Sequence, residues 1–108
     1  MIINLFHDLD PIDLTLVIRN RLRYQKHFVW ELSPKQTDMA ISMLNRFEAL
    51  QKNTVEEIEL TDLEARLLYD GLTFHIVNYP HEQEANEVSR LINKIRTELD
   101  IETTNIVM

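Results

Sequence analysis

The residues best suited to chemistry lie in the stretch RNRLRYQKHFVW, residues 19–30. Four cations stand among three aromatic residues there, with no acidic side chain between them. Cations that contact phosphates beside aromatic rings that stack on bases are typical of single-strand and RNA binders. Trp, Tyr and Arg are also enriched in the hot spots of protein interfaces. The stretch therefore predicts a partner-binding site made of Arg19, Arg21, Arg23, Tyr24, Lys26 and Trp30.

An internal role explains the same stretch more simply. Cations near a helix C-terminus offset the helix dipole, and the segment VEEIELTDLE, residues 55–64, offers carboxylates that could face them. Phe28 and Trp30 would then anchor the first helix to the second in the core. Four cations are also a small footprint for nucleic acid, because affinity scales with the number of neutralised phosphates. The net charge of −7 further repels polyanions.

Residue types that bind metals occur near the N-terminus, at His7, Asp8, Asp10 and Asp13. Their spacing fits neither a calcium loop nor a zinc site, and acidic residues at a helix start more often cap the helix and complement its dipole. With a single Gly and no Cys, a glycine-rich phosphate loop, a serine nucleophile elbow and a cysteine nucleophile are all excluded. The sequence therefore predicts no enzyme, no metal site and no cofactor.

The elements that must position these residues are predicted to be helices. Ser33 and Gln36 form a capping box around Pro34, which suits the first helical position. Thr61 and Glu64 form a second box. The hydrophobic residues after the first box recur at helical spacing: Ala40, Met43, Leu44, Phe47 and Leu50. Two helices are therefore expected to begin at these boxes.

The helix that follows Thr61 is predicted to continue across Gly71. Hydrophobic residues recur every three or four positions from Leu63 to Tyr79. A mid-helix glycine costs about 1 kcal/mol relative to alanine, so close packing is expected at this point. Residues 72–79 are also rich in β-branched and aromatic types and could form a strand after Asp70. The continuous helix is favoured because the spacing crosses Gly71 without slipping.

The last helix is predicted to start at Pro80. Its hydrophobic residues form a heptad seam suited to packing along another helix, with Val88, Ile92, Ile95 and Leu99 in alternate steps of four and three. Residues 61–100 therefore predict an antiparallel helical hairpin. The same seam is a candidate surface for self-association of two copies of the chain.

The first third of the chain is ambiguous. Asp10 before Pro11, with cations toward the end, predicts a helix from about Pro11 to Lys26. The same stretch alternates Leu, Ile and polar residues in a way that suits a strand. The alternative fold is therefore α+β, with a small sheet from residues 14–24, 28–32 and 72–79.

Length and composition bound the protein as a whole. The 108 residues fit one domain, and 44 % hydrophobic with 27 % charged residues is ordinary for a soluble globular protein. No apolar run is long enough for a membrane span, and the N-terminus lacks the cationic leader of a signal peptide. We expect one all-α domain of three or four helices over residues 1–100, a flexible tail at residues 101–108 and a cytoplasmic location.

These features predict a small acidic, non-enzymatic protein–protein interaction module that acts as a regulator, adaptor or inhibitor. Its partner is expected to be another protein, with a homo-oligomer as an option and no membrane association. The alternative is a nucleic-acid or nucleotide-phosphate binder that uses residues 19–30.

Overall fold

Capped starts define the helices of the computed structural model, which describes residues 1–5, 7–24, 31–52, 55–79 and 85–100. Helix α1 spans Pro11–Arg23 and begins where the Asp10 carboxylate accepts a hydrogen bond from the backbone N–H of Asp13 (2.9 Å). Proline suits the first helical position because it has no N–H to satisfy. The predicted start is confirmed, whereas α1 ends three residues before the predicted end.

The next two helices start at the predicted capping boxes. In α2, Pro34–Leu50, Ser33 Oγ accepts from the N–H of Gln36 (3.1 Å), and the Gln36 side chain accepts from the N–H of Ser33 (2.9 Å). In α3, Asp62–Asn78, Thr61 and Glu64 make the same reciprocal pair (3.2 and 2.9 Å). Each box satisfies two backbone donors that a helix start leaves without an intrahelical partner.

Helix α3 continues through Gly71, so the alternative strand at residues 72–79 is wrong. A methyl group on Gly71 would lie 2.7 Å from Val17 Cγ1 and 3.1 Å from the Val17 carbonyl oxygen. The first distance is shorter than real Cβ contacts and the second is tighter than most of them, so glycine is what lets α1 and α3 cross this closely. The predicted close packing at Gly71 is confirmed, and its neighbour is α1.

Helix α1 also replaces the alternative strand at residues 14–24. It buries one stripe of side chains at helical spacing: Leu14, Val17, Ile18 and Arg21. Of the remaining alternative strand, residues 28–30 lie outside the described residues, and residues 31 and 32 have no regular secondary structure. The α+β alternative is therefore not the fold.

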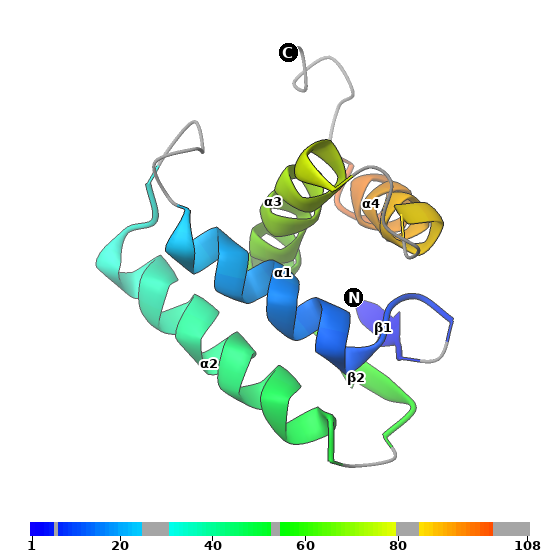
Figure 1. Ribbon diagram of the computed structural model, residues 1–108, viewed down its shortest axis with the longest axis horizontal. Helices are drawn as coiled ribbons and strands as arrows, with labels where there is room; N and C mark the ends of the chain where they lie inside the picture. Colours follow the sequence, from blue (N-terminus) through cyan, green and yellow to red (C-terminus); the bar gives the residue numbers. More distant parts are fainter. Residues whose placement is uncertain (6, 25–30, 53–54, 80–84, 101–108) are drawn as a thin grey trace.

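Helix α4, Ala85–Glu98, completes the helical hairpin with α3. Its predicted start at Pro80 lies outside the described residues. Figure 1 shows α1 packed against both α2 and α3, with α4 packed against α3. Buried hydrophobic residues from all four helices form one core, and the all-α prediction is confirmed. Within the ranges that the structure describes, no helix has the length and apolarity to cross a membrane.

A small antiparallel sheet was not predicted. Strand β1, Ile2–Asn4, pairs with β2, Glu57–Glu59, so that Ile3 stands opposite Ile58. Ile3 is fully buried and joins the core. Strands of three residues are too short for the alternating pattern by which a strand is recognised in a sequence, which is why the sequence analysis missed them.

Candidate functional site

The described residues of the predicted basic-aromatic site do not form one surface. Arg19 is exposed and donates to Glu48 of α2 (3.0 Å), which ties α1 to its neighbour. The guanidinium of Arg23 lies over the Tyr24 ring, 5.9 Å from its centroid. That ring stacks on Phe74 of α3 at 5.7 Å between centroids. Lys26, Phe28 and Trp30 lie outside the described residues.

Arg21 is the clearest departure from the predicted site, because it is fully buried between α1 and α3. Burial lowers the pKa of Arg21, and the nearby Asp70 carboxylate opposes that shift. Burial likewise raises the pKa of Asp70 to about 6, against the pull of Arg21 and Arg66. Arg21 therefore has no surface from which to bind a partner, which corrects the predicted site.

The internal interpretation named the wrong acidic partners for these cations. Arg19 and Arg21 face Glu48 and Asp70, neither of which belongs to the segment 55–64. In that segment, Glu64 lies 3.4 Å from the guanidinium of Arg46 on α2. The acidic segment therefore meets α2 through this pair rather than the end of α1.

The heptad seam of α4 faces its own chain. Val88, Ile92 and Ile95 are buried in the core, and Leu99 is half-buried against it. Helix α3 is the partner that covers this seam. In the folded chain these side chains are therefore not available for self-association.

The N-terminal acids have structural partners. Asp8 accepts from Lys94 of α4 (2.7 Å) and from the backbone N–H of Asn4 (2.8 Å), and Asp10 caps α1. No group of three or more metal-ligating side chains was found among the described residues. His75 is buried on α3, with its ring 5.1 Å from that of Tyr79. Asp8, Asp10 and His75 thus each contact other parts of the fold.

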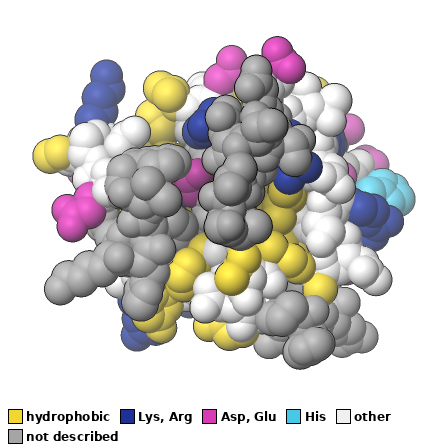
Figure 2. Space-filling model, turned by 90° about the horizontal axis from the view of Figure 1, so that it is seen from above, with side chains coloured by type: hydrophobic (Ala, Val, Ile, Leu, Met, Phe, Trp, Pro, Cys, Tyr) yellow, Lys and Arg dark blue, Asp and Glu magenta, His cyan; other side chains and the backbone are white. Residues whose placement is uncertain are grey.

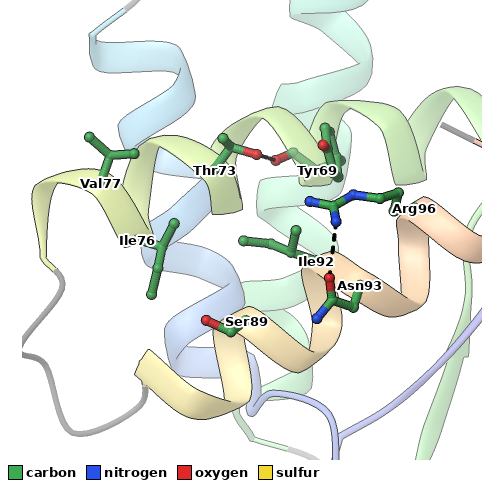
Figure 3. A pocket seen from close by; sticks show the side chains of 8 residues that line it. All are labelled: Tyr69, Thr73, Ile76, Val77, Ser89, Ile92, Asn93 and Arg96. Carbon is green, nitrogen blue, oxygen red and sulfur yellow. Dashed lines mark hydrogen bonds between the residues drawn. The ribbon is translucent and has the colours of Figure 1, made fainter. Parts of the chain in front are cut away.

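A groove between α3 and α4 is the best candidate site. Its volume is about 280 Å³, and both helices line it with residues at helical spacing: Tyr69, Thr73, Ile76 and Val77 from α3, and Ser89, Ile92, Asn93 and Arg96 from α4. Figure 3 shows Tyr69 beside Arg96 at one end and Ile76 beside Ser89 at the other, as an antiparallel hairpin requires. Ile76 and Ile92 provide an apolar floor.

Two polar atoms in this groove lack partners. The Tyr69 hydroxyl is buried and makes no hydrogen bond to any described residue, and Tyr69 as a whole is only 6 % exposed. The Nε of Arg96 is also buried and makes no hydrogen bond to any described residue, whereas its Nη1 donates to Asn93 Oδ1 (3.3 Å). A buried polar group without a hydrogen bond costs about 1–3 kcal/mol, and native proteins retain few of them. Two polar groups beside the groove, the Tyr69 hydroxyl and the Arg96 Nε, therefore have hydrogen-bonding capacity that the described residues do not use.

A second hollow, between α1 and α2, is larger but less informative. Its volume is about 670 Å³, and its lining includes Arg19, Glu48, Gln51 and Lys52. Arg19 and Glu48 bind each other, and the Gln51 amide donates to the Thr15 hydroxyl (3.0 Å). Its main polar groups are thus already satisfied within the chain.

The groove was not predicted from the sequence, although a signal was present. Ser89, Asn93 and Arg96 are spaced by four and three residues and so follow one side of α4 next to the heptad seam. Tyr69, Thr73 and Ile76 have the same spacing on α3. Which polar rows face each other depends on how the two helices are rotated in the hairpin, and one sequence does not specify that rotation.

The described residues that line the groove include no carboxylate and no histidine, which are the usual acid–base and metal-ligating groups. Comparisons with protein-family models, with curated proteins and with solved structures gave no match.

Proposed function

We propose that this chain is a non-enzymatic protein–protein interaction module, acting in the cytoplasm as a regulator, adaptor or inhibitor, and that it binds its partner in the α3–α4 groove. The buried Tyr69 hydroxyl, which has no hydrogen-bond partner among the described residues, carries the proposal. A bound segment would supply that partner and recover the free energy of the missing hydrogen bond. The absence of Cys from the sequence is compatible with a reducing compartment.

Exposed hydrophobic surface beside the groove supports a protein partner. Val77 lines the groove with 61 % of its surface exposed, and Tyr79 follows at 38 %. Figure 2 shows hydrophobic side chains in the lower middle of one face of the molecule, with uncharged polar surface beside them and charged side chains above. Exposed apolar patches with polar borders are typical of interaction sites, and Tyr is enriched in their energetic centres.

The size of the groove fits a short segment of a partner chain. Its volume is about 280 Å³, at the lower limit of the range of about 300–1,000 Å³ for pockets that hold drug-sized ligands. One or two side chains of a partner fit a groove of this size, while the rest of the partner lies over the neighbouring surface. In an interface of this kind, a few anchor side chains of the partner dock in a groove between helices.

The nucleic-acid alternative has less support. Of the basic residues proposed for it, Arg21 is buried and Arg19 is held by Glu48, so Arg23 is the described cation that still faces solvent without an ion pair. Because affinity for nucleic acid scales with the number of neutralised phosphates, this footprint is small.

Capture experiments with matched variants test the proposal. Val77→Glu places a charge in the groove, whereas Leu63→Glu places the same charge elsewhere on α3 at a side chain that is equally exposed (62 % against 61 %). Proteins captured from the native host by wild type are identified by mass spectrometry, purified and tested for direct binding. We expect Leu63→Glu to bind as wild type does and Val77→Glu to lose binding at least tenfold. Equal binding by both variants would contradict the proposed site, and salt-sensitive binding of oligonucleotides alone would favour the alternative.

A further inference from the structure

The charges around the groove indicate what its occupant carries. On α4, Arg90 pairs with Glu87 (3.6 Å), and Lys94 pairs with Asp8 (2.7 Å). Arg96 has no carboxylate partner within the described ranges, and its contact there is the neutral amide of Asn93. An arginine without a counter-charge is notable in a chain with 18 acidic and 11 basic residues, because acidic partners are plentiful. Arg96 is therefore the cation of α4 that remains available for an external anion.

Hydrogen-bond donors remain in the groove near Arg96 after the hydrogen bonds among the described residues are counted. The Asn93 side chain uses its oxygen to accept from Arg96, which leaves its NH₂ group as the donor end. The Thr73 hydroxyl already donates to the backbone carbonyl of Tyr69 (2.8 Å). Figure 3 shows the Arg96 side chain reaching from α4 toward Tyr69 on α3, above Ile92. An acceptor at this end would meet the N–H of Arg96 and the O–H of Tyr69.

A carboxylate fits this arrangement better than a neutral acceptor. Hydrogen bonds between ionised partners are about twice as strong as those between neutral groups, and arginine geometry matches a carboxylate. The apolar floor beside the donors, formed by Ile76 and Ile92, suits an aliphatic side chain next to that carboxylate. None of the described residues that line the groove is acidic, so none of these side chains repels an incoming anion.

We propose that the groove recognises an acidic segment of a partner protein, in which an aliphatic side chain lies next to a Glu or Asp carboxylate. The aliphatic side chain packs on Ile76 and Ile92, and the carboxylate accepts from Arg96 and Tyr69. This inference rests on the proposed function and specifies the chemistry of the partner.

Two matched peptides test the carboxylate directly. N-acetyl-Leu-Glu-amide and N-acetyl-Leu-Gln-amide have nearly the same size and shape and differ in the charge of one side chain. Each is titrated into the isotope-labelled protein while backbone amide shifts are followed by NMR. We expect the Glu peptide to move signals of Thr73, Val77 and Asn93 with a dissociation constant on the order of 1 mM. The Gln peptide should bind at least about tenfold more weakly, since charge assistance contributes more than about 1.4 kcal/mol.

Three variants assign the effect to the groove. Arg96→Gln should remove the preference for Glu over Gln, and Tyr69→Phe should weaken binding of the Glu peptide several-fold. Arg90→Gln removes the same charge from the same helix at a side chain that is 71 % exposed, so its preference should match wild type. Circular dichroism confirms that each variant is folded, which Tyr69→Phe should be because it loses only an unused hydroxyl.

The outcomes separate this inference from the proposed function. Equal binding of the two peptides, absence of shifts in the groove, or an equal effect of Arg90→Gln and Arg96→Gln would overturn the carboxylate inference. The proposed function would survive any of these results if Val77→Glu still abolished binding of the captured partner. It would fail if Val77→Glu and Leu63→Glu bound that partner equally.

Discussion

Helix α3 packs tightly against α1 but leaves a groove where it packs against α4. Its contact with α1 is closed: Gly71 touches Val17, and the buried Arg21 faces the Asp70 carboxylate. Its contact with α4 leaves a groove of about 280 Å³, in which the Tyr69 hydroxyl has no partner among the described residues. Tyr69 and Asp70 are adjacent in sequence, and one helical step of about 100° turns them toward different neighbours. The closed contact stabilises the fold, and the open one is where we propose that a partner binds.

The largest effect should come from removing the counter-charge in the closed contact. Asp70→Ala removes the half-buried carboxylate that attracts the fully buried Arg21, and removing one partner of a buried charge pair costs about 3–5 kcal/mol. Part of that cost is offset, because burial disfavours the Asp70 charge more than Arg21 favours it, so the free energy of unfolding, measured in urea at neutral pH, should fall by less than that amount. Asp62→Ala, at an exposed position in the first turn of α3, should cost less than about 1 kcal/mol. Similar losses in both variants would show that the interaction of Arg21 with Asp70 contributes no more to the free energy of unfolding than an exposed acidic residue does.

The pH dependence of stability should reveal the same pair. The pKa of Asp70 is raised from its ordinary value of 3.8 to about 6 by burial, despite Arg21 and Arg66. Between these values the folded chain retains a proton that the unfolded chain has lost, so this group favours folding at low pH. Its contribution, about 2–3 kcal/mol, is lost as pH rises through about 6.

Comparison with Asp70→Asn isolates that contribution from the other carboxylates. Urea denaturation of both proteins between about pH 4 and pH 7 gives the difference in unfolding free energy at each pH. The stability of wild type relative to Asp70→Asn should decline by about 2–3 kcal/mol across this interval. A constant difference would place the pKa of Asp70 near its ordinary value and would argue against its burial beside Arg21.

A smaller loss is expected at the helix crossing. Gly71→Ala gains about 1 kcal/mol of helix propensity, but the new methyl group would lie 2.7 Å from Val17 Cγ1. Separating α1 from α3 should outweigh the gain and leave a net loss of about 1–2 kcal/mol in thermal or urea unfolding. The double variant Val17→Ala, Gly71→Ala should show favourable coupling between the two changes. Val17→Ala removes the methyl group with which the new Cβ at position 71 would clash. Additive losses would indicate that the two helices do not meet at this point.

The smallest effect, with the opposite sign, is expected in the open contact. Tyr69→Phe removes a buried hydroxyl that makes no hydrogen bond to the described residues, so the melting temperature should stay constant or rise slightly. The gain should stay below the cost of about 1–3 kcal/mol for an unpaired buried hydroxyl, because removing the hydroxyl also leaves a small void. A loss of more than about 1 kcal/mol would mean that the hydroxyl serves the fold, and the contrast between the two contacts of α3 would disappear.

Local signals in the sequence were sufficient for the helices but not for the contacts between them. The caps at Asp10, Ser33 and Thr61 act over three residues, so they could be identified without knowing the fold. Gly71 indicated close packing but not its neighbour. Arg21 was read as a helix-end cation, although its position seven residues after Leu14 already placed it on the buried stripe.

The groove and the sheet could not be predicted for a different reason. Both depend on distant segments: residues 69–77 against 89–96 in one case, and residues 2–4 against 57–59 in the other. Which segments meet is decided by the packing of the whole core, and a single sequence contains no covariation to reveal it. The fold class could therefore be predicted from the sequence, whereas the candidate site was found only in the structure.

The small sheet has a consequence for the order of folding. The β1–β2 pairing spans α1 and α2, which lie between the two strands in the chain. Closing so long a loop for a few hydrogen bonds is entropically unfavourable until these helices have already brought its ends together. We therefore expect the sheet to form after the transition state, so that Ile3→Val accelerates unfolding and barely changes the folding rate. A folding rate that fell in proportion to the lost stability would instead place the sheet in the nucleus. If the sheet closes late, it slows unfolding and so sets the lifetime of the folded chain, but it does not affect how fast the chain folds.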